Sequence, residues 1–151
     1  MQSRPSCRYA VGDHATSPDF RYDAAAFLLN CDTGSIESDE FIFIRKHSNR
    51  EYDLQDLTWI PVGGIGANDA GPLIRWEGPT ELSVKFYQKM PLIIAKEFQS
   101  KNKILNLSIN QEYSITRYEY NFQKYKRIHY ENDSNVLNLF WMNKLGITAL
   151  Q

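Results

Sequence analysis

The sequence lacks a long apolar run and is poor in cysteine. No stretch of its 151 residues approaches the length that a transmembrane helix needs, and residues 1–6 lack the apolar core of a signal peptide. Cys7 and Cys31 are the only two cysteines. We therefore expect a reducing, cytoplasmic setting with both thiols free. A Cys7–Cys31 disulfide is the less favoured alternative, because nothing else in the sequence points to export.

The chain also lacks an excess of charge of either sign. Its formal net charge is −1 and its pI is about 6.3, whereas general nucleic-acid binders usually carry a clear basic excess. Tyrosines do alternate with basic residues between positions 113 and 130, a pattern that could stack single-stranded nucleic acid. We favour strands whose rings pack on the core, and predict no nucleic-acid partner.

Catalytic motifs are missing as well. His14, His47 and His129 stand in unlike contexts, without the short spacing of a zinc site. No Gly-x-Ser-x-Gly elbow occurs, and Cys31 beside Asp32 has no evident activating base. A hydrolase is a third alternative that no motif nominates, so the prediction is a protein that is not an enzyme.

What the sequence does contain is a set of strand patterns. Aromatic residues make up 13 % of the chain and suit pleated sheets, and 151 residues can bury a core without disulfide or metal. The clearest pattern lies at residues 19–44, where alternation, a turn at 32–34 and renewed alternation predict two antiparallel strands. The side chains expected on one side of the first strand are those of Phe20, Tyr22, Ala24 and Ala26.

Further elements are expected in order along the chain. Residues 45–53 are charged without periodicity, which predicts a solvated loop presenting Arg45, Lys46 and Arg50. Residues 92–99 fit either one or two helical turns or a strand. The remaining expectations are a strand at 7–11 closed by Gly12 and Asp13, a loop at 13–18, an edge strand or packed loop at 54–62, a Gly-rich loop at 63–72, two strands around a turn at 78–79, a buried strand at 103–111, a turn at 131–135 and a hairpin pairing 126–130 with 136–141.

Several of these segments resemble the TerD family of tellurium-resistance and stress-response proteins. Residues 13–29, DHATSPDFRYDAAAFLL, look like the family's opening motif, an Asp-rich loop that leads into a strand reading FDLDASAFLL. Residues 36–43, IESDEFIF, resemble the next element, usually VRSD followed by FVF. Later segments (81–91, 104–109 and 122–130) are similar to further family strands, so the resemblance runs in order over most of the chain and is densest at its start.

The resemblance implies an antiparallel β-sandwich with few short helices, and a calcium site. Calcium takes about six to eight oxygen ligands, and the Gly-rich loop offers such donors but no phosphate-binding Gly-x-x-x-x-Gly-Lys pattern. Two departures weaken the implied site: Arg21 stands where the family has an aspartate, and the loop holds fewer acids. The alternative is that these acids form turns and caps. The implied ligands are Asp19, Asp23, Asn68 and Asp69, with Asp13 and Asp39 as supporting or alternative ligands.

The predicted function is a non-enzymatic TerD-like binding or scaffold module, associated with stress response or defence, with Ca²⁺ as a candidate ligand. The alternative is a protein-interaction module, such as an immunity protein or a subunit of a phage-like assembly, that uses the sandwich without metal. We expect a single domain over residues 1–151 that ends before the family's last strands. An open sheet edge would then pair with a protein partner or a second copy.

Overall fold

The computed structural model describes residues 7–31, 39–65, 72–86, 93–94, 98, 105–113 and 129–134. Nine strands lie in these ranges, and Phe98 and Leu105 are the described residues with helical conformation. The fold is therefore mostly β, as the sequence predicts. No helix among the described residues is long and apolar enough to cross a membrane. The strands are β1 (Cys7–Thr16), β2 (Tyr22–Cys31), β3 (Asp39–Lys46), β4 (Ile60–Ile65), β5 (Leu73–Gly78), β6 (Glu81–Phe86), β7 (Ile93–Ile94), β8 (Ser108–Tyr113) and β9 (His129–Ser134).

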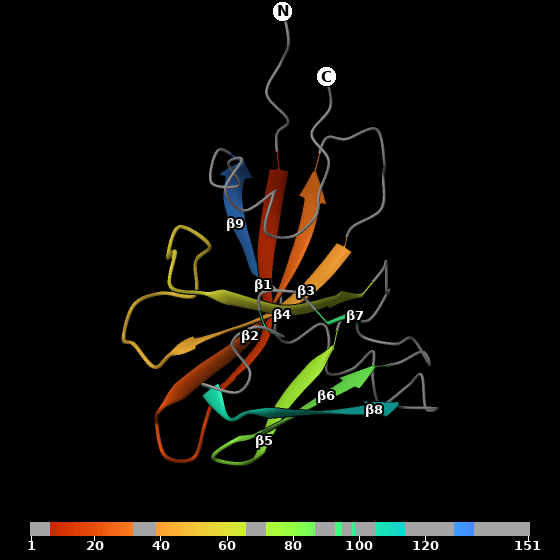
Figure 1. Ribbon diagram of the computed structural model, residues 1–151. Helices are drawn as coiled ribbons and strands as arrows, with labels where there is room; N and C mark the ends of the chain where they lie inside the picture. Colours follow the sequence, from red (N-terminus) through yellow and green to blue (C-terminus); the bar gives the residue numbers. More distant parts are fainter. Residues whose placement is uncertain are drawn as a thin grey trace, which may run out of the picture.

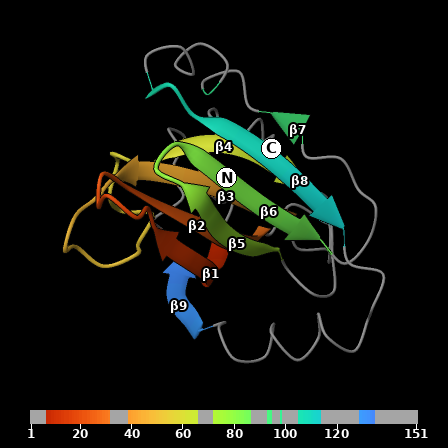
Figure 2. The same cartoon turned by 90° about the horizontal axis from the view of Figure 1, so that it is seen from below.

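The strands form two sheets. The larger sheet has the order β7-β4-β3-β2-β1-β9, and the smaller has the order β5-β6-β8. Figure 1 shows the smaller sheet below the larger one, and in Figure 2 it lies in front of β2, β3 and β4. The larger sheet is antiparallel throughout its described pairs, whereas β6 pairs with β8 in parallel. The sandwich prediction is thus corrected at this one pair.

The central hairpin of the prediction is confirmed. β2 and β3 pair antiparallel from Tyr22 opposite Lys46 to Leu29 opposite Asp39, without a register shift. Alternate β2 side chains face opposite layers, as the period of two requires: Ala24 packs towards the smaller sheet and Phe27 packs on the other face. Phe20 is predicted on one side of this strand with Tyr22, Ala24 and Ala26, but it lies outside β2 and is 69 % exposed. The predicted turn at 32–34 lies outside the described residues.

Bulges explain two further differences from the prediction. β1 does not end at Gly12 but continues to Thr16, because one extra residue in β1 between Val11 and His14 is absorbed as a bulge. The pairing of β3 with β4 shifts register between Ile42 and Phe43, and Pro61 of β4, the partner of Phe43, lies at that shift. A bulge is one of the few places where a sheet accepts proline. Residues 63–65, expected in the Gly-rich loop, therefore belong to β4, which lies between β3 and β7 and is no edge strand.

The second half of the chain departs more from the prediction. β8 begins at Ser108 rather than near residue 103, after Asn106 with a φ of 52°. β9 runs through Glu131–Ser134, where a turn was expected, and pairs with β1. Within residues 92–99, β7 is a short strand and Phe98 is helical, and the other positions lie outside the described residues. The predicted strand at 136–141 and most of the tyrosine-rich segment lie outside the described residues.

The larger sheet carries a core on each face. The face towards the smaller sheet packs side chains such as Ala24, Ile44 and Leu82, and we call it the inter-sheet core. The other face packs Phe27, Phe43, Leu54 and Trp59, and is covered by the segment 47–59 that connects β3 to β4. We call it the covered core. The polar residues described next lie at one end of it.

Candidate functional site

The strand register places three polar side chains side by side at the end of the covered core. In β1, β2 and β3, Thr16 lies opposite Asp23, and Asp23 lies opposite Arg45. Alternation along β3 puts Arg45 on the same face as Phe43, which belongs to the covered core. Asp23 and Arg45 are both fully buried. A buried ion pair thus continues a row of apolar residues.

Both oxygens of the Asp23 carboxylate accept hydrogen bonds from the protein. Oδ1 accepts hydrogen bonds from the Thr16 hydroxyl at 2.8 Å and from His47 Nδ1 at 2.8 Å. Oδ2 accepts from Arg45 Nε at 3.0 Å and from the Ser48 backbone N–H at 3.2 Å. Burial alone would raise the pKa of Asp23, but the hydrogen bonds from His47, Thr16, Arg45 and Ser48 outweigh it and lower the pKa below its ordinary value. Asp23 is therefore an ionised carboxylate inside the fold.

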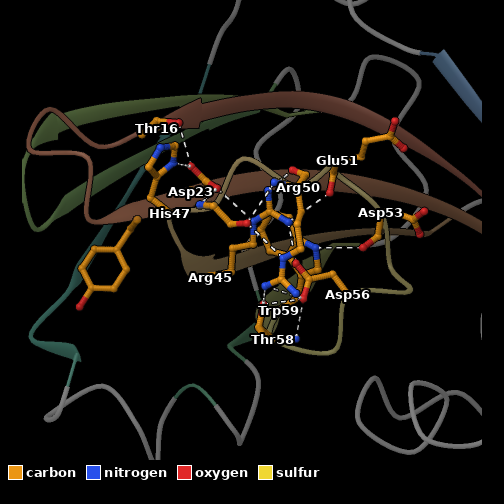
Figure 3. A network of polar contacts seen from close by, with 12 residues as sticks. Thr16, Asp23, Arg45, His47, Arg50, Glu51, Asp53, Asp56, Thr58 and Trp59 are labelled. Carbon is orange, nitrogen blue, oxygen red and sulfur yellow. Dashed lines mark hydrogen bonds and ion pairs between the residues drawn. The ribbon is translucent and has the colours of Figure 1, made fainter.

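Arg45 joins the sheet to the segment 47–59. Its Nη1 donates to Asp56 Oδ2 at 2.7 Å and to the Glu51 carbonyl at 3.1 Å, and its Nη2 donates to the Arg50 carbonyl at 2.8 Å. The guanidinium also lies over the rings of Trp59 and Tyr52, at 4.4 and 4.9 Å from their centroids. One planar cation therefore holds together two carboxylates, two backbone carbonyls and two aromatic rings (Figure 3).

Aspartate turns shape the segment that covers Arg45. Asp53 accepts the Gln55 N–H at 2.8 Å and the Tyr9 hydroxyl at 2.6 Å, so it ties a turn to β1. Asp56 accepts the Thr58 N–H at 3.0 Å. Burial tends to raise the pKa of Asp56, but hydrogen bonds from Thr58 and Arg45 and the charge of Arg50 lower it. The segment predicted as a solvated loop is thus an ordered cover, and the prediction was wrong for Arg45, although Lys46 and Arg50 are exposed.

His47 lies where the buried network meets solvent. Its backbone N–H donates to the Arg21 carbonyl at 2.9 Å, and its ring is 5.8 Å from the ring of Phe20. An ionised Asp23 can only accept a hydrogen bond, so Nδ1 of the neutral His47 ring carries the proton and donates it. Nε2 is then left as an acceptor. The same pairing of carboxylate and imidazole orients catalytic and metal-bound histidines. In this arrangement it gives one fixed imidazole at the surface.

The turn between β1 and β2 is held by Ser17. Its N–H donates to the Tyr22 carbonyl at 2.8 Å, and its hydroxyl oxygen accepts from the Arg21 and Tyr22 N–H groups at 3.1 and 3.0 Å. The Ser17 hydroxyl donates to Asp19 at 2.9 Å. These bonds fix Phe20 with a φ of 59°, a left-handed conformation that bulky residues rarely adopt.

The sequence-predicted calcium ligands are distributed unevenly. Asp19 lies within the β1–β2 turn and Asp23 is the second residue of β2, but the Asp23 carboxylate is buried among protein donors while the Asp19 side chain is 32 % exposed. Asp13 lies in the β1 bulge, where its Oδ2 accepts the Ile74 N–H of β5 at 2.7 Å and so links the two sheets. No cluster of three or more potential metal ligands occurs among the described residues. Asp39 begins β3, and Asn68 and Asp69 lie outside the described residues.

Arg45, His47, Asp56 and Trp59 were not singled out from the sequence as one group. A signal was present for Arg45, because it follows Phe41 and Phe43 with the spacing of two that marks one face of a strand. The other members come from an irregular segment, whose path no periodicity specifies.

Comparisons with models of protein families, with curated proteins and with solved structures found no significant match. The TerD resemblance is therefore a prediction that no relative tests.

Proposed function

We propose that the chain is a non-enzymatic, TerD-like binding or scaffold module that acts in a cytoplasmic stress-response or defence system. Its binding surface in this proposal is the end of the larger sheet around Phe20, with Arg21, Lys46 and His47 beside it; we call this the Phe20 patch. The observation that carries the proposal is the placement of Phe20 itself.

Phe20 combines exposure with an unfavourable backbone. The residue is 69 % exposed, so burial within the chain does little to offset the cost of a left-handed φ of 59° in a bulky residue. Residues held in such conformations cluster at functional sites. Aromatic side chains are also frequent anchors of protein interfaces. Both features support a role for Phe20 in binding a partner.

The surroundings of Phe20 are rigid and carry exposed cations. The Arg21 carbonyl accepts the His47 N–H, and His47 is in turn bonded to the buried Asp23, so the patch is connected to the ordered core. A preorganised surface loses little conformational entropy on binding. Arg21 and Lys46, the chain neighbours of Phe20 and His47, are exposed, and Arg21 Nε lies 3.6 Å from Asp19 Oδ2. This chemistry favours a protein segment with an apolar side chain flanked by acidic residues.

Site-specific photo-cross-linking in the source cell tests the proposal. A photoreactive phenylalanine analogue at position 20 should yield a discrete cross-linked product, whereas the same analogue at Leu57 should not. Leu57 is a matched control, because it is the other exposed large apolar side chain described, at 56 % exposure. A product at position 20 that contains two copies of this chain would identify the partner as a homo-oligomer. Equal products at both positions, or none at position 20, would contradict the proposal.

The variant Phe20→Gly separates binding from folding. Glycine adopts positive φ without a steric cost, so the thermal midpoint should stay the same or rise while the cross-linked partner is lost in a competition assay. If Phe20→Gly instead lowers the midpoint by more than about 5 °C, the ring stabilises the fold, and the strain argument for binding is wrong.

Calcium binding is a second candidate, which the exposure of Asp19 favours. Since Asp23 is saturated by protein donors, the ligand set we propose is Asp19 together with Asn68 and Asp69. Calcium at about one hundred times its dissociation constant would stabilise the chain by roughly 2.7 kcal/mol and raise the midpoint by several degrees. Asp19→Asn and Asp69→Asn should each abolish that rise, with magnesium as the control ion. An unchanged midpoint in calcium would leave the metal-free module as the proposed function.

A further inference from the structure

The only two cysteines of the chain meet in the strand register. Cys7 is the first residue of β1 and Cys31 is the last residue of β2, and the two are direct partners in the antiparallel ladder. The sequence alone favours two free thiols over this pairing. The register changes that balance, because it brings together two residues that are far apart along the chain.

The register at this end of the hairpin is well specified. Five consecutive pairs, from Cys7 opposite Cys31 to Val11 opposite Phe27, run without a shift before the bulge. Tyr9, Val11, Phe27 and Leu29 in this stretch are buried in the covered core, and a slip by one residue would turn all of them to the opposite face. The burial of these side chains therefore holds the two cysteine positions opposite one another.

Directly opposite positions in an antiparallel ladder meet the distance requirement of a disulfide. Their Cα atoms are about 4.5 or 5.5 Å apart, depending on the type of pair, and disulfides span Cα separations of roughly 4.4–6.8 Å. Opposite residues also share one face of the sheet. Both types of pair therefore meet the Cα requirement of a bridge.

We propose that Cys7 and Cys31 form a reversible cross-strand disulfide when the chain meets an oxidising low-molecular-weight disulfide such as oxidised glutathione. One cysteine thiolate attacks a sulfur of the oxidant and releases one reduced thiol. The second cysteine thiolate then attacks the mixed disulfide at the protein sulfur and releases the second reduced thiol. Two cysteine thiols are oxidised and one small disulfide is reduced to two thiols, so electrons and protons balance.

The bridge would fix one end of the larger sheet. Cys7 is also a register partner of Ser134 in β9, so β1 lies between two strands at this position. A cross-link that closes the loop from Cys7 to Cys31 restricts the unfolded chain, and we expect the thermal midpoint to rise by roughly 5–10 °C on oxidation. This inference concerns oxidation of the hairpin and does not depend on the partner proposed for the Phe20 patch.

Equilibration of the purified full chain in glutathione buffers tests the proposal. The expected product is a monomer that has lost two hydrogens by mass spectrometry, with a Cys7–Cys31 peptide after digestion and a midpoint potential independent of protein concentration. The equilibrium constant for forming the intramolecular bond should be at least tenfold larger in the folded chain than in the chain unfolded by urea, since the ladder prepositions the two residues. Equal equilibrium constants in the folded and unfolded chains, or a folded chain that only forms mixed disulfides, would overturn the proposal.

A register-shifted variant provides the matched control. The double substitution Cys7→Ser with Arg8→Cys keeps two cysteines at nearly the same sequence separation, but residue 8 is the partner of Asn30 and lies on the opposite face from residue 31. This variant should accumulate mixed disulfide with glutathione and at least tenfold less intramolecular bond than the natural chain. A folded variant that closes as readily as the natural chain would show that proximity in sequence, and not the register, controls the reaction.

Discussion

The two faces of the larger sheet are built by the same strands but are stabilised differently. The inter-sheet core is apolar and is covered by a second sheet, in which Leu82 and Val84 of β6 alternate with more polar neighbours. The covered core is closed by an irregular segment and ends in the Asp23–Arg45–Asp56 ion network. A regular cover needs only side-chain packing, because its backbone groups pair within the sheet.

An irregular cover must satisfy its backbone groups in another way. Arg45 accomplishes part of this by donating to the carbonyls of Arg50 and Glu51, and the Trp59 indole N–H donates to the Asp53 carbonyl at 3.1 Å. The charged residues of the covered core thus take the place of a missing strand ladder. It follows that the two faces should respond differently to substitution.

The largest effect is expected from Arg45→Met. The substitution leaves Asp23 and Asp56 buried without their shared cation, and removal of one partner from a buried ion pair costs roughly 3–5 kcal/mol of unfolding free energy. Urea unfolding followed by circular dichroism measures the loss. Arg45→Lys is the control that keeps the positive charge and changes the geometry. A single ammonium cannot supply the planar donors that reach Asp23, Asp56 and two carbonyls. A loss below about 1 kcal/mol for Arg45→Met would mean that the covered core does not depend on the network.

Leu82→Ala tests the apolar face in the same assay. Leu82 is fully buried in the inter-sheet core, and leucine-to-alanine changes in cores cost roughly 2–5 kcal/mol. The pH distinguishes the two faces further, since a cavity in an apolar core should cost the same at neutral and at acid pH, whereas the Arg45 effect should shrink once Asp23 and Asp56 are protonated. An Arg45 effect and a Leu82 effect with the same dependence on pH would contradict the proposed difference between the faces.

Sequence alone predicts the inter-sheet side of the fold well. Alternation in β2, β3, β5 and β6 is regular, so the hairpins and many of their buried residues follow from the period of two. The bulges in β1 and β4 do not follow from it, because Gly12 and Pro61 predict strand ends, whereas the structure accommodates both within strands. Local propensity was overridden there by pairing with β2 and β3.

The polar site is harder to predict for a different reason. Asp23 and Arg45 become neighbours only when the register of β2 and β3 is fixed, and Asp56 joins them from an irregular segment. The charged residues of 45–53 predict a solvent-exposed loop. Lys46 and Arg50 are exposed, but Arg45 is buried. The partners of this guanidinium cannot be inferred from spacing, since Asp23 lies in β2 whereas Asp56 and the two carbonyls lie in the irregular segment 47–59.

Acid should weaken the covered core selectively. The pKa values of Asp23 and Asp56 are lowered below the ordinary value of 3.8, so their contribution to stability is fully present above that value and is lost as pH falls through the lower folded-state pKa values. Unfolding free energy should therefore fall below about pH 4. Asp56→Asn should have a shallower acid slope than the natural chain. An identical slope in both proteins would show that other carboxyl groups control acid unfolding.

A smaller effect is expected where β4 approaches β3. A Cβ added at Gly64 would lie 2.7 Å from Cε1 of the Phe41 ring, closer than carbon atoms normally approach, so the ring has to move. Gly64→Ala should cost roughly 1–2 kcal/mol through this overpacking. Gly78→Ala is the control, because the nearest atom to its added Cβ is at 4.0 Å. Equal unfolding free energies for the two variants would show that the ring moves freely.

The smallest effect should come from the exposed ion pair of β5. Arg75 donates to Glu77 through Nε at 3.0 Å, with side chains that are 62 % and 38 % exposed. Water and salt screen such a pair, so Glu77→Gln should change the unfolding free energy by at most about 0.5 kcal/mol, and less at high salt. Asp56→Asn, which removes a carboxylate from the same kind of contact with a buried guanidinium, should cost several times more. If the two substitutions cost the same, burial would not be what gives the Arg45 network its strength, and the distinction between the covered core and the exposed surface would fail.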